Sequence, residues 1–342
     1  MTERQNGTGT SAGRARGPVT IYDVARLSGV SPSTVSRALN NPGRLSADTE
    51  KRIREVADAV GYRLNPMARA LPTGRTHTVG LILSDITNPV YFDLVRGVER
   101  VAAGRGYILI LAESQESADL ENETAQRLLA SVDGLILVAT RLDNADIRAL
   151  AERKPLFVVN RKVRGIPGVV PDVVPGIRAA LDHLAEQGHR SIAYLAGPSG
   201  SWMSRLRGRT LDLTAGERGM TIVEIGPGEP TLHGGQAALQ GVRDSGATAV
   251  LAYNDLMATG LLKACRDGGV RVPEELSVIG FDDIFGSDFT SPPLTTIRTP
   301  LGLVGDEAAR RLIAAVEKGE EGRRTPLATE FVLRGSTAPP RG

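Results

Sequence analysis

The chain has 342 residues, of which 41% are apolar and 23% are charged, and its formal net charge is +2. Since a common domain has about 100 to 150 residues, two or more hydrophobic cores are expected. No apolar run reaches the roughly 20 residues that cross a bilayer, which excludes a membrane protein. A single cysteine, Cys265, excludes both an internal disulfide and a thiolate zinc site.

The charge is unevenly distributed along the chain. Residues 1–75 hold 12 Arg and Lys against 6 Asp and Glu, whereas the remaining residues hold 29 against 33. A basic end on an acidic body is typical of a polyanion-binding module joined to a second module, although a solvated charged tail has the same composition. Residues 1–17 contain no apolar stretch, so we expect a disordered tail rather than a signal peptide, and a cytoplasmic protein.

Residues 18–64 are predicted to form three short helices. Gly29 can adopt the left-handed conformation that a tight turn between two helices needs. A cap residue followed by Pro32 predicts a second helix over residues 32–40, and a third helix follows Ser46. This spacing indicates a helix-turn-helix and an all-α DNA-binding headpiece.

The predicted second helix has an outward face suited to a major groove. Ser33, Thr34 and Ser36 supply short hydrogen-bonding groups, and Arg37 supplies a long bidentate donor. An amphipathic bundle whose polar residues merely face water would explain any one helix taken alone. The basic charge and the turn together favour DNA binding.

Three runs of residues carry a dense, ungapped resemblance to a known family: TIYDVARLSGVSPSTVSRALN, RLSADTEKRIREVADAVGY and NPMARAL. They resemble the DNA-binding headpiece of the LacI/GalR transcriptional regulators. The resemblance implies that Pro32, Ser33 and Arg37 face base edges. Many relatives carry larger polar residues at the positions of Pro32 and Ser33. We therefore expect Arg37 to make the main base contact, with a guanine. The residues implied to hold phosphates or set register are Thr20, Thr34, Ser36 and Asn40.

Residues 65–75 are predicted to form a hinge helix and linker. A free helix needs about 12 residues even in good sequences, so the short segment from Asn65 to Leu71 requires another surface in order to fold. An ordinary linker is the alternative. The resemblance implies a hinge helix in the minor groove, with Asn65, Ala68 and Leu71 at the DNA and Leu71 wedged into a base step.

From residue 76 onward, predicted strands alternate with helices, which indicates an open α/β fold. One barrel, one large sheet and two smaller sheets are all compatible with that pattern. The predicted helices include residues 92–104, 176–187, 235–245 and 256–267. The predicted strands are 78–84, 107–111, 134–139, 155–160, 191–195, 221–225, 249–253 and 277–281.

The family resemblance continues through VPEELSVIGFDD, SPPLTTIRTP and EQGHRSIAYLAGP. It implies a periplasmic-binding-protein-like effector domain over residues 76–335, with two lobes of parallel sheet and a small molecule in the cleft between them. The chain is expected to cross between lobes near Lys162, Thr290 and Arg324. The expected limits are 76–162 and 290–323 for the first lobe, 163–289 and 324–335 for the second, and 336–342 for a tail.

Polar residues follow many of these strands, where ligands of open α/β sheets bind. Amide, carboxylate and guanidinium groups suit vicinal hydroxyls, and Tyr91 and Phe92 could offer an apolar face to a sugar ring. Asp and Asn at strand ends also commonly cap the next helix, so each alone can be structural. The polar candidates are Asp85, Asn88, Asn160, Arg161, Asn254, Asp255, Asp282 and Asp283. The resemblance implies effector contacts for Asn88, Phe92, Asn160, Arg161, Arg205, Asn254 and Asp282.

The chain departs from many relatives at three places near the expected cleft. It has Asn160 in place of an aspartate, Val173 in place of an asparagine, and no aromatic residue near Pro230. The pocket has therefore lost a charge and a stacking ring. We expect an effector that differs from a plain hexose in a polar substituent, or a phosphorylated sugar or disaccharide.

Competing functions lack their required residues. The four histidines stand in no recognisable constellation, and there is no G-x-S-x-G, P-loop or metal spacing, so we predict no enzyme, no cofactor and no metal site. A transport receptor would share the body but would need export and no headpiece. The sequence therefore predicts a repressor that binds a palindromic operator as a homodimer, with affinity linked to a small-molecule effector.

Overall fold

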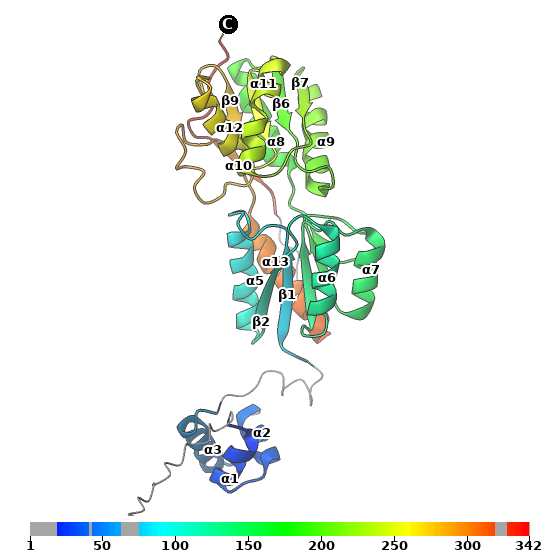
Figure 1. Ribbon diagram of the computed structural model, residues 1–342, viewed down its shortest axis with the longest axis vertical. Helices are drawn as coiled ribbons and strands as arrows, with labels where there is room; N and C mark the ends of the chain where they lie inside the picture. The colour runs from blue at the N-terminus through cyan, green and yellow to red at the C-terminus, as the bar shows by residue number, and fades with distance from the viewer. Residues whose placement is uncertain (1–18, 41–42, 63–74, 319–326, 342) are drawn as a thin grey trace, which may run out of the picture. The chain divides into compact units, whose positions relative to one another are not determined.

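The computed structural model describes residues 19–40, 43–62, 75–318 and 327–341. The chain divides into two compact units, Met1–Gly74 with the headpiece and Arg75–Gly342, which we call the body. Figure 1 shows the headpiece helices in blue and the α/β body from cyan to red. Within the described ranges, no helix is long and apolar enough to cross a membrane.

The headpiece consists of α1 (Ile21–Ser28), α2 (Pro32–Asn40) and α3 (Ala47–Ala59). Gly29 follows α1 with φ 67°, the left-handed turn conformation expected of it, and α2 has the predicted bounds. One apolar face of each helix closes a small core, because apolar residues recur three and four positions apart. The buried side chains are Val24, Ala25, Val35, Ala38, Ile53 and Ala57.

The body contains two separate parallel sheets. Of the architectures compatible with the sequence, two smaller sheets is therefore the observed one, and one barrel and one large sheet are excluded. The first has the order β2-β1-β3-β4-β5 and the second β7-β6-β8-β9. Each predicted strand is present, with ends that differ by at most two residues. The first sheet comprises β1 (Thr78–Leu83), β2 (Ile108–Glu113), β3 (Gly134–Val138), β4 (Leu156–Val159) and β5 (Gly168–Val169). The second comprises β6 (Ser191–Leu195), β7 (Thr221–Ile225), β8 (Ala249–Ala252) and β9 (Ser277–Ile279).

Helices cover both faces of each sheet, which is why the central strands are apolar without alternation. In the first lobe, α5 and α13 share one core with β1, and α6 and α7 share another with β3. In the second lobe, α8 and α9 cover one face, and α11 and α12 cover the other. The first set is α5 (Tyr91–Gly104), α6 (Ala118–Leu128), α7 (Asn144–Arg153) and α13 (Leu301–Glu317). The second is α8 (Val174–Gln187), α9 (Trp202–Gly216), α10 (Leu232–Ala237), α11 (Leu239–Ser245) and α12 (Asp255–Asp267).

The chain passes between the lobes several residues later than expected at the first two crossings. β5 pairs with β4, so the first lobe continues past residue 162 to about 169. Bridges from Ile279 to Thr295 and from Asp282 to Arg298 keep residues 295–298 in the second lobe. Two-residue strands and isolated bridges leave no periodic pattern in a sequence, which explains the displaced boundaries.

The third crossing and the last residues also differ from expectation. Arg324 lies outside the described residues, but Leu327 packs in the first lobe and β11 (Glu330–Val332) pairs antiparallel with β10 (Thr296–Arg298). The expected tail from residue 336 is part of the second lobe, because Val278 N–H donates to the Ser336 carbonyl (2.8 Å) and the Ser277 hydroxyl donates to the Ala338 carbonyl (3.0 Å).

Candidate functional site

The headpiece presents one face of α2 to solvent. Val35 and Ala38 point into the core, whereas Ser33 and Arg37, one helical turn apart, are exposed. The hydroxyls of Ser33 and Thr34 each hydrogen bond with the Ser31 hydroxyl (2.8 Å), which fixes the start of the helix. This reading face, defined by Ser33 and Arg37, can enter a groove without loss of core packing.

Other predicted DNA contacts flank the reading face. Pro32, Thr34 and Ser36 are half-buried in α2, and Thr20 is exposed before α1. The Asp23 carboxylate accepts hydrogen bonds from the Thr20 N–H (3.0 Å) and hydroxyl (2.8 Å), which lower the pKa of Asp23 and close the first turn. Asn40 ends α2. The side chain of Asn40 and all of Asn65, Ala68 and Leu71 lie outside the described part of the chain.

A cavity of about 490 Å³ lies in the cleft between the two lobes of the body. The first lobe lines it with Asp85, Asn88, Tyr91, Glu116 and Arg141. The second lobe lines it with Ser199, Glu229, Tyr253 and Asn254, among others. An adjoining cavity of about 40 Å³ shares Val90, Tyr91, Ala139 and Tyr253 with the first, and adds Asn160, Arg207 and Asp282. The combined space accommodates a small polar molecule.

A buried ion pair forms the floor of the smaller cavity. Arg207 donates to the Asp282 carboxylate (2.8 Å), and both side chains are less than a tenth exposed. Arg207 also donates to the Tyr253 carbonyl, and its guanidinium carbon lies 3.6 Å from the centre of the Phe281 ring. The Arg207 Nε is buried and has no hydrogen-bond partner among the described residues. A ligand oxygen or a water at that position would satisfy it.

Strained backbone conformations gather at the strand ends that line these cavities. Ala139 after β3, Asn160 after β4 and Asp282 after β9 have φ values of 52°, 63° and 110°. Such backbone costs a residue like Ala139 about 1 to 3 kcal/mol and costs asparagine and aspartate less, and it is often found at ligand sites. The strain therefore supports a binding role for the cleft.

The polar groups in the larger cavity are held by the fold. Asn254 caps α12, accepting from Met257 N–H (2.8 Å) and donating to the Pro230 carbonyl (2.9 Å). The Tyr91 hydroxyl bonds to Ser84 (2.8 Å), and burial raises the pKa of Tyr91, so this hydroxyl keeps its proton. Donors and acceptors thus face the cavity in fixed positions, which suits a polyhydroxylated ligand.

Two predicted effector contacts, Arg161 and Arg205, line neither of the two cleft cavities. Arg161 donates to the carbonyls of Thr140 and Leu142 within the first lobe. Arg205 lies on the exposed side of α9 and donates to the Ser199 carbonyl (2.8 Å). It lines another cavity of about 320 Å³, which shares Pro198, Ser199 and Pro227 with the larger cleft cavity. The structure therefore does not bring either arginine to the two cleft cavities.

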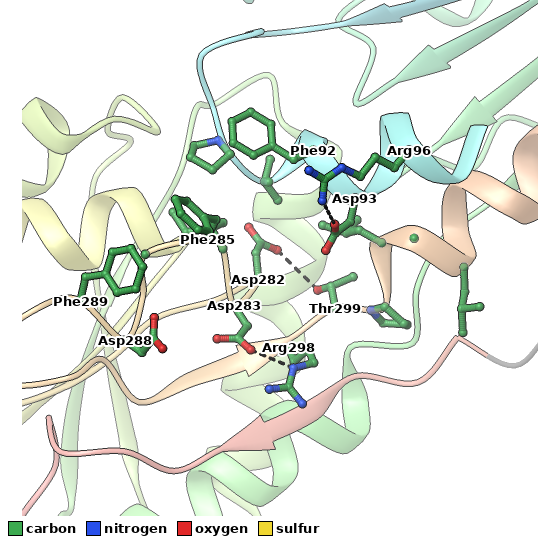
Figure 2. Close-up of a pocket in the computed structure, with 18 of the residues that line it drawn as sticks. Phe92, Asp93, Arg96, Asp282, Asp283, Phe285, Asp288, Phe289, Arg298 and Thr299 are labelled. Carbon is green, nitrogen blue, oxygen red and sulfur yellow. Dashed lines mark hydrogen bonds and ion pairs between the residues drawn. The ribbon is translucent and has the colours of Figure 1, made fainter. Parts of the chain in front are cut away.

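Phe92 faces an outer groove of about 790 Å³ rather than the cleft cavities, because it follows the inward-facing Tyr91 by one helical position. Figure 2 shows Phe92 in this groove with Phe285 and Phe289, which stack edge to face with ring centres 5.3 Å apart. Asp282 lines both the groove and the smaller cavity. The loop that follows β9 therefore forms a wall between them.

Asp255 and Asp283 have structural partners. The Asp255 carboxylate accepts from the Thr296 hydroxyl (2.6 Å), the Ser287 hydroxyl (2.8 Å) and the Ile284 N–H (2.8 Å), which ties the loop after β9 to α12. Asp283 pairs with Arg298 (2.8 Å) and Arg334 (2.6 Å). Neither carboxylate lines the two cleft cavities, and both stabilise the loop after β9.

The residues that sequence reasoning missed are Glu116, Arg141, Tyr253, Arg207 and Glu229. Arg207 had a usable signal, because Met203, Arg207 and Leu211 recur every four residues on the buried side of α9. Arg205 is rotated by about 200° from Arg207 and must face outward. Glu116 and Arg141 belong to loops that meet only because β2 and β3 both pair with β1.

The headpiece and the two-lobed body together define a class of protein that couples DNA binding to ligand sensing. The family model for bacterial regulatory proteins of the lacI family matches residues 20–65, and the model for a periplasmic binding protein-like domain matches residues 181–337. The repressor CytR of Escherichia coli K12 is 33% identical over 327 residues, covering 93% of this chain and 96% of CytR. The regulator GalS of Salmonella typhimurium LT2 is 35% identical over 291 residues, covering 83% and 86%.

Solved structures agree with this assignment. The Lac repressor dimer bound to operator and the anti-inducer ONPF has a TM-score of 0.84 and 28% identity, with coverage of 94% of this chain and all of that one. The CelR–cellobiose complex has a TM-score of 0.68 and 30% identity, with coverage of 93% and 99%. The chain belongs to the lacI family of bacterial regulatory proteins. It is a DNA-binding transcriptional regulator and not an enzyme, as predicted.

Proposed function

We propose that this protein represses transcription in the cytoplasm as a homodimer on a palindromic operator, and that a carbohydrate or carbohydrate derivative in the cleft controls its affinity for DNA. The exposed reading face of α2 carries the DNA-binding part of this proposal. A single headpiece offers one such face and can read only a half-site, so a two-fold dimer and a two-fold operator match each other. The dimeric, operator-bound Lac repressor supports the same arrangement.

The cleft supports the effector part of the proposal. It holds a fixed set of amide, hydroxyl, carboxylate and guanidinium groups around a cavity of about 490 Å³. CelR with cellobiose and a lacI-family regulator from Enterococcus faecium with ribose provide analogies from similar chains. If the effector favours one lobe arrangement and DNA another, each changes the affinity for the other by the same factor.

The roles of individual residues form part of the proposal. Arg37 reads a guanine, and Asn65, Ala68 and Leu71 contact the minor groove when the hinge segment orders on DNA. In the cleft, five of the residues predicted from the sequence contact the effector, and Arg207 contacts it as well. The five residues are Asn88, Tyr91, Asn160, Asn254 and Asp282.

The reading face is tested by selecting operators from a randomised duplex library with the full chain, then measuring Arg37→Ala on the selected and on random DNA. The variant should lose about 1 to 3 kcal/mol of specific binding and little non-specific binding. Arg26→Ala removes the same charge from an exposed site on α1 and is the matched control. Equal losses of affinity on the selected and the random DNA would exclude Arg37 from base readout. Selected sequences without two-fold symmetry would contradict binding of a dimer to a palindromic operator.

A further inference from the structure

One end of the cleft contains an ion pair between two loops of the first lobe. Arg141 follows β3 and pairs with Glu116, which follows β2. The Arg141 side chain is 9% exposed and the Glu116 side chain 30%. Both line the cavity of about 490 Å³, so this pair differs from the solvent-exposed pairs on the helices.

The backbone on each side of the pair is held in place. Arg141 N–H donates to the buried Glu121 carboxylate (2.8 Å), and the Arg141 guanidinium donates to the Ala139 carbonyl (2.8 Å). Gln115, Glu116 and Ala139 have φ values of 51°, 60° and 52°. Such strained residues persist only where the surrounding structure holds them. Here they place a carboxylate and a guanidinium at the same cavity.

Arg141 also reaches the second lobe. A Cβ placed on Gly200 would lie 3.6 Å from the Arg141 Cδ, so the arginine stem lies beside the loop before α9. A ligand that contacts Arg141 would therefore act where the two lobes meet.

The charged side chains that line the larger cavity itself are predominantly acidic. Among the described residues that line it, Asp85, Glu116 and Glu229 are carboxylates and Arg141 is the one guanidinium. In the smaller cavity Arg207 and Asp282 balance each other. A phosphate group in this cavity would therefore meet more negative than positive charge, and like charges repel. Asp85 and Glu116 are half-buried, so water screens their charges less than it screens that of the exposed Glu229.

We propose that the cleft selects an uncharged or cationic polyhydroxylated effector against its phosphorylated form, and that Arg141 and Glu116 read the polar end of that effector. A guanidinium beside a carboxylate offers adjacent donors and acceptors, which match a diol or an amino alcohol. This inference rests on the proposed function, because it takes the cleft as the effector site. It narrows the expected effectors by excluding the phosphorylated sugar.

Calorimetry on the full chain tests the charge preference with three matched sets of probes. These are D-glucose, D-glucosamine and D-glucose 6-phosphate; D-ribose and D-ribose 5-phosphate; and cellobiose with its 6-phosphate. In each set that binds, the phosphate ester should bind at least about tenfold more weakly than its parent. A phosphate ester that binds more tightly than its parent, or a panel in which no uncharged or amino sugar binds, overturns the proposal.

Variants then assign the preference to residues. Glu116→Gln should reduce the discrimination against the phosphate ester by about tenfold. Arg141→Met should weaken the binding of the parent sugar by a similar factor. Glu123→Gln is the matched control, because Glu123 pairs with Arg127 on the exposed side of α6. An identical response of Glu116→Gln and Glu123→Gln overturns the role of Glu116. Operator binding is measured on the same preparation. If the protein binds operator but shows no preference against phosphate esters, this inference fails while the proposed DNA-binding function stands.

Discussion

The reading face of the headpiece and the floor of the cleft use arginine in opposite ways. Arg37 is exposed on α2, whereas Arg207 is buried on α9 between Asp282 and two aromatic rings. An exposed side chain can be replaced to suit a binding partner without loss of folding stability. A buried charge depends on its counter-ion for the stability of the lobe, so binding and folding are coupled in the cleft.

The largest expected effect comes from Asp282→Ala. It leaves the Arg207 guanidinium buried without its counter-charge, which should lower the free energy of unfolding of the body by about 3 to 5 kcal/mol. Trp202 is the only tryptophan in the sequence and begins α9, so its fluorescence in a urea titration reports the second lobe.

Asp267→Ala is the control for Asp282→Ala, because Asp267 lies on α12 in the same lobe as Trp202. Asp267 pairs with Arg266 at 3.4 Å, with side chains 58% and 70% exposed, and its loss should change the stability of that lobe by less than about 1 kcal/mol. Arg37→Ala should leave the Trp202 transition unchanged. Equal destabilisation by the three substitutions would remove the contrast between the two arginines.

A pH-dependent effect should follow from the buried Asp255. Burial raises the pKa of Asp255 to about 7, against the opposing hydrogen bonds from Thr296, Ile284 and Ser287. Between pH 4 and 7 the folded protein then holds a proton that the unfolded chain has released. The contribution of Asp255 to stability is therefore complete at low pH and is lost as pH rises through about 7.

Asp255→Asn should remove this dependence. The difference in unfolding free energy between the wild type and the variant should fall by at least about 1 kcal/mol from pH 4 to pH 7, measured by the Trp202 transition. Asp288→Asn removes an exposed carboxylate from the same loop and serves as the control. A constant difference across this range would show that Asp255 is ionised when the protein is folded.

The same contrast explains how much could be predicted from sequence. Headpiece signals are local: Gly29, Pro32 and the i, i+4 spacing fix the turn and the bounds of α2 without reference to distant residues. Asn254 and Asp282 were identifiable because each directly follows a predicted strand, and the carboxyl ends of parallel strands share one edge.

The remainder of the cleft depends on information that is not local. Choosing Arg207 over Arg205 requires the phase of α9 relative to the core. Pairing Glu116 with Arg141 requires knowing that β2 and β3 flank β1. The boundaries between lobes depend on β5 and on isolated bridges, which a composition or periodicity argument does not register.

The smallest expected effect tests whether the headpiece owes its turn to backbone conformation alone. A Cβ on Gly29 would meet nothing within 4 Å, so Gly29→Ala should cost only the left-handed penalty of about 1 kcal/mol. Hydrogen exchange of the α1 and α2 amides should accelerate about fivefold while the body is unaffected. Gly29→Asn should accelerate exchange less, since asparagine tolerates this conformation. If alanine and asparagine act alike, the turn is held by something other than the freedom of glycine.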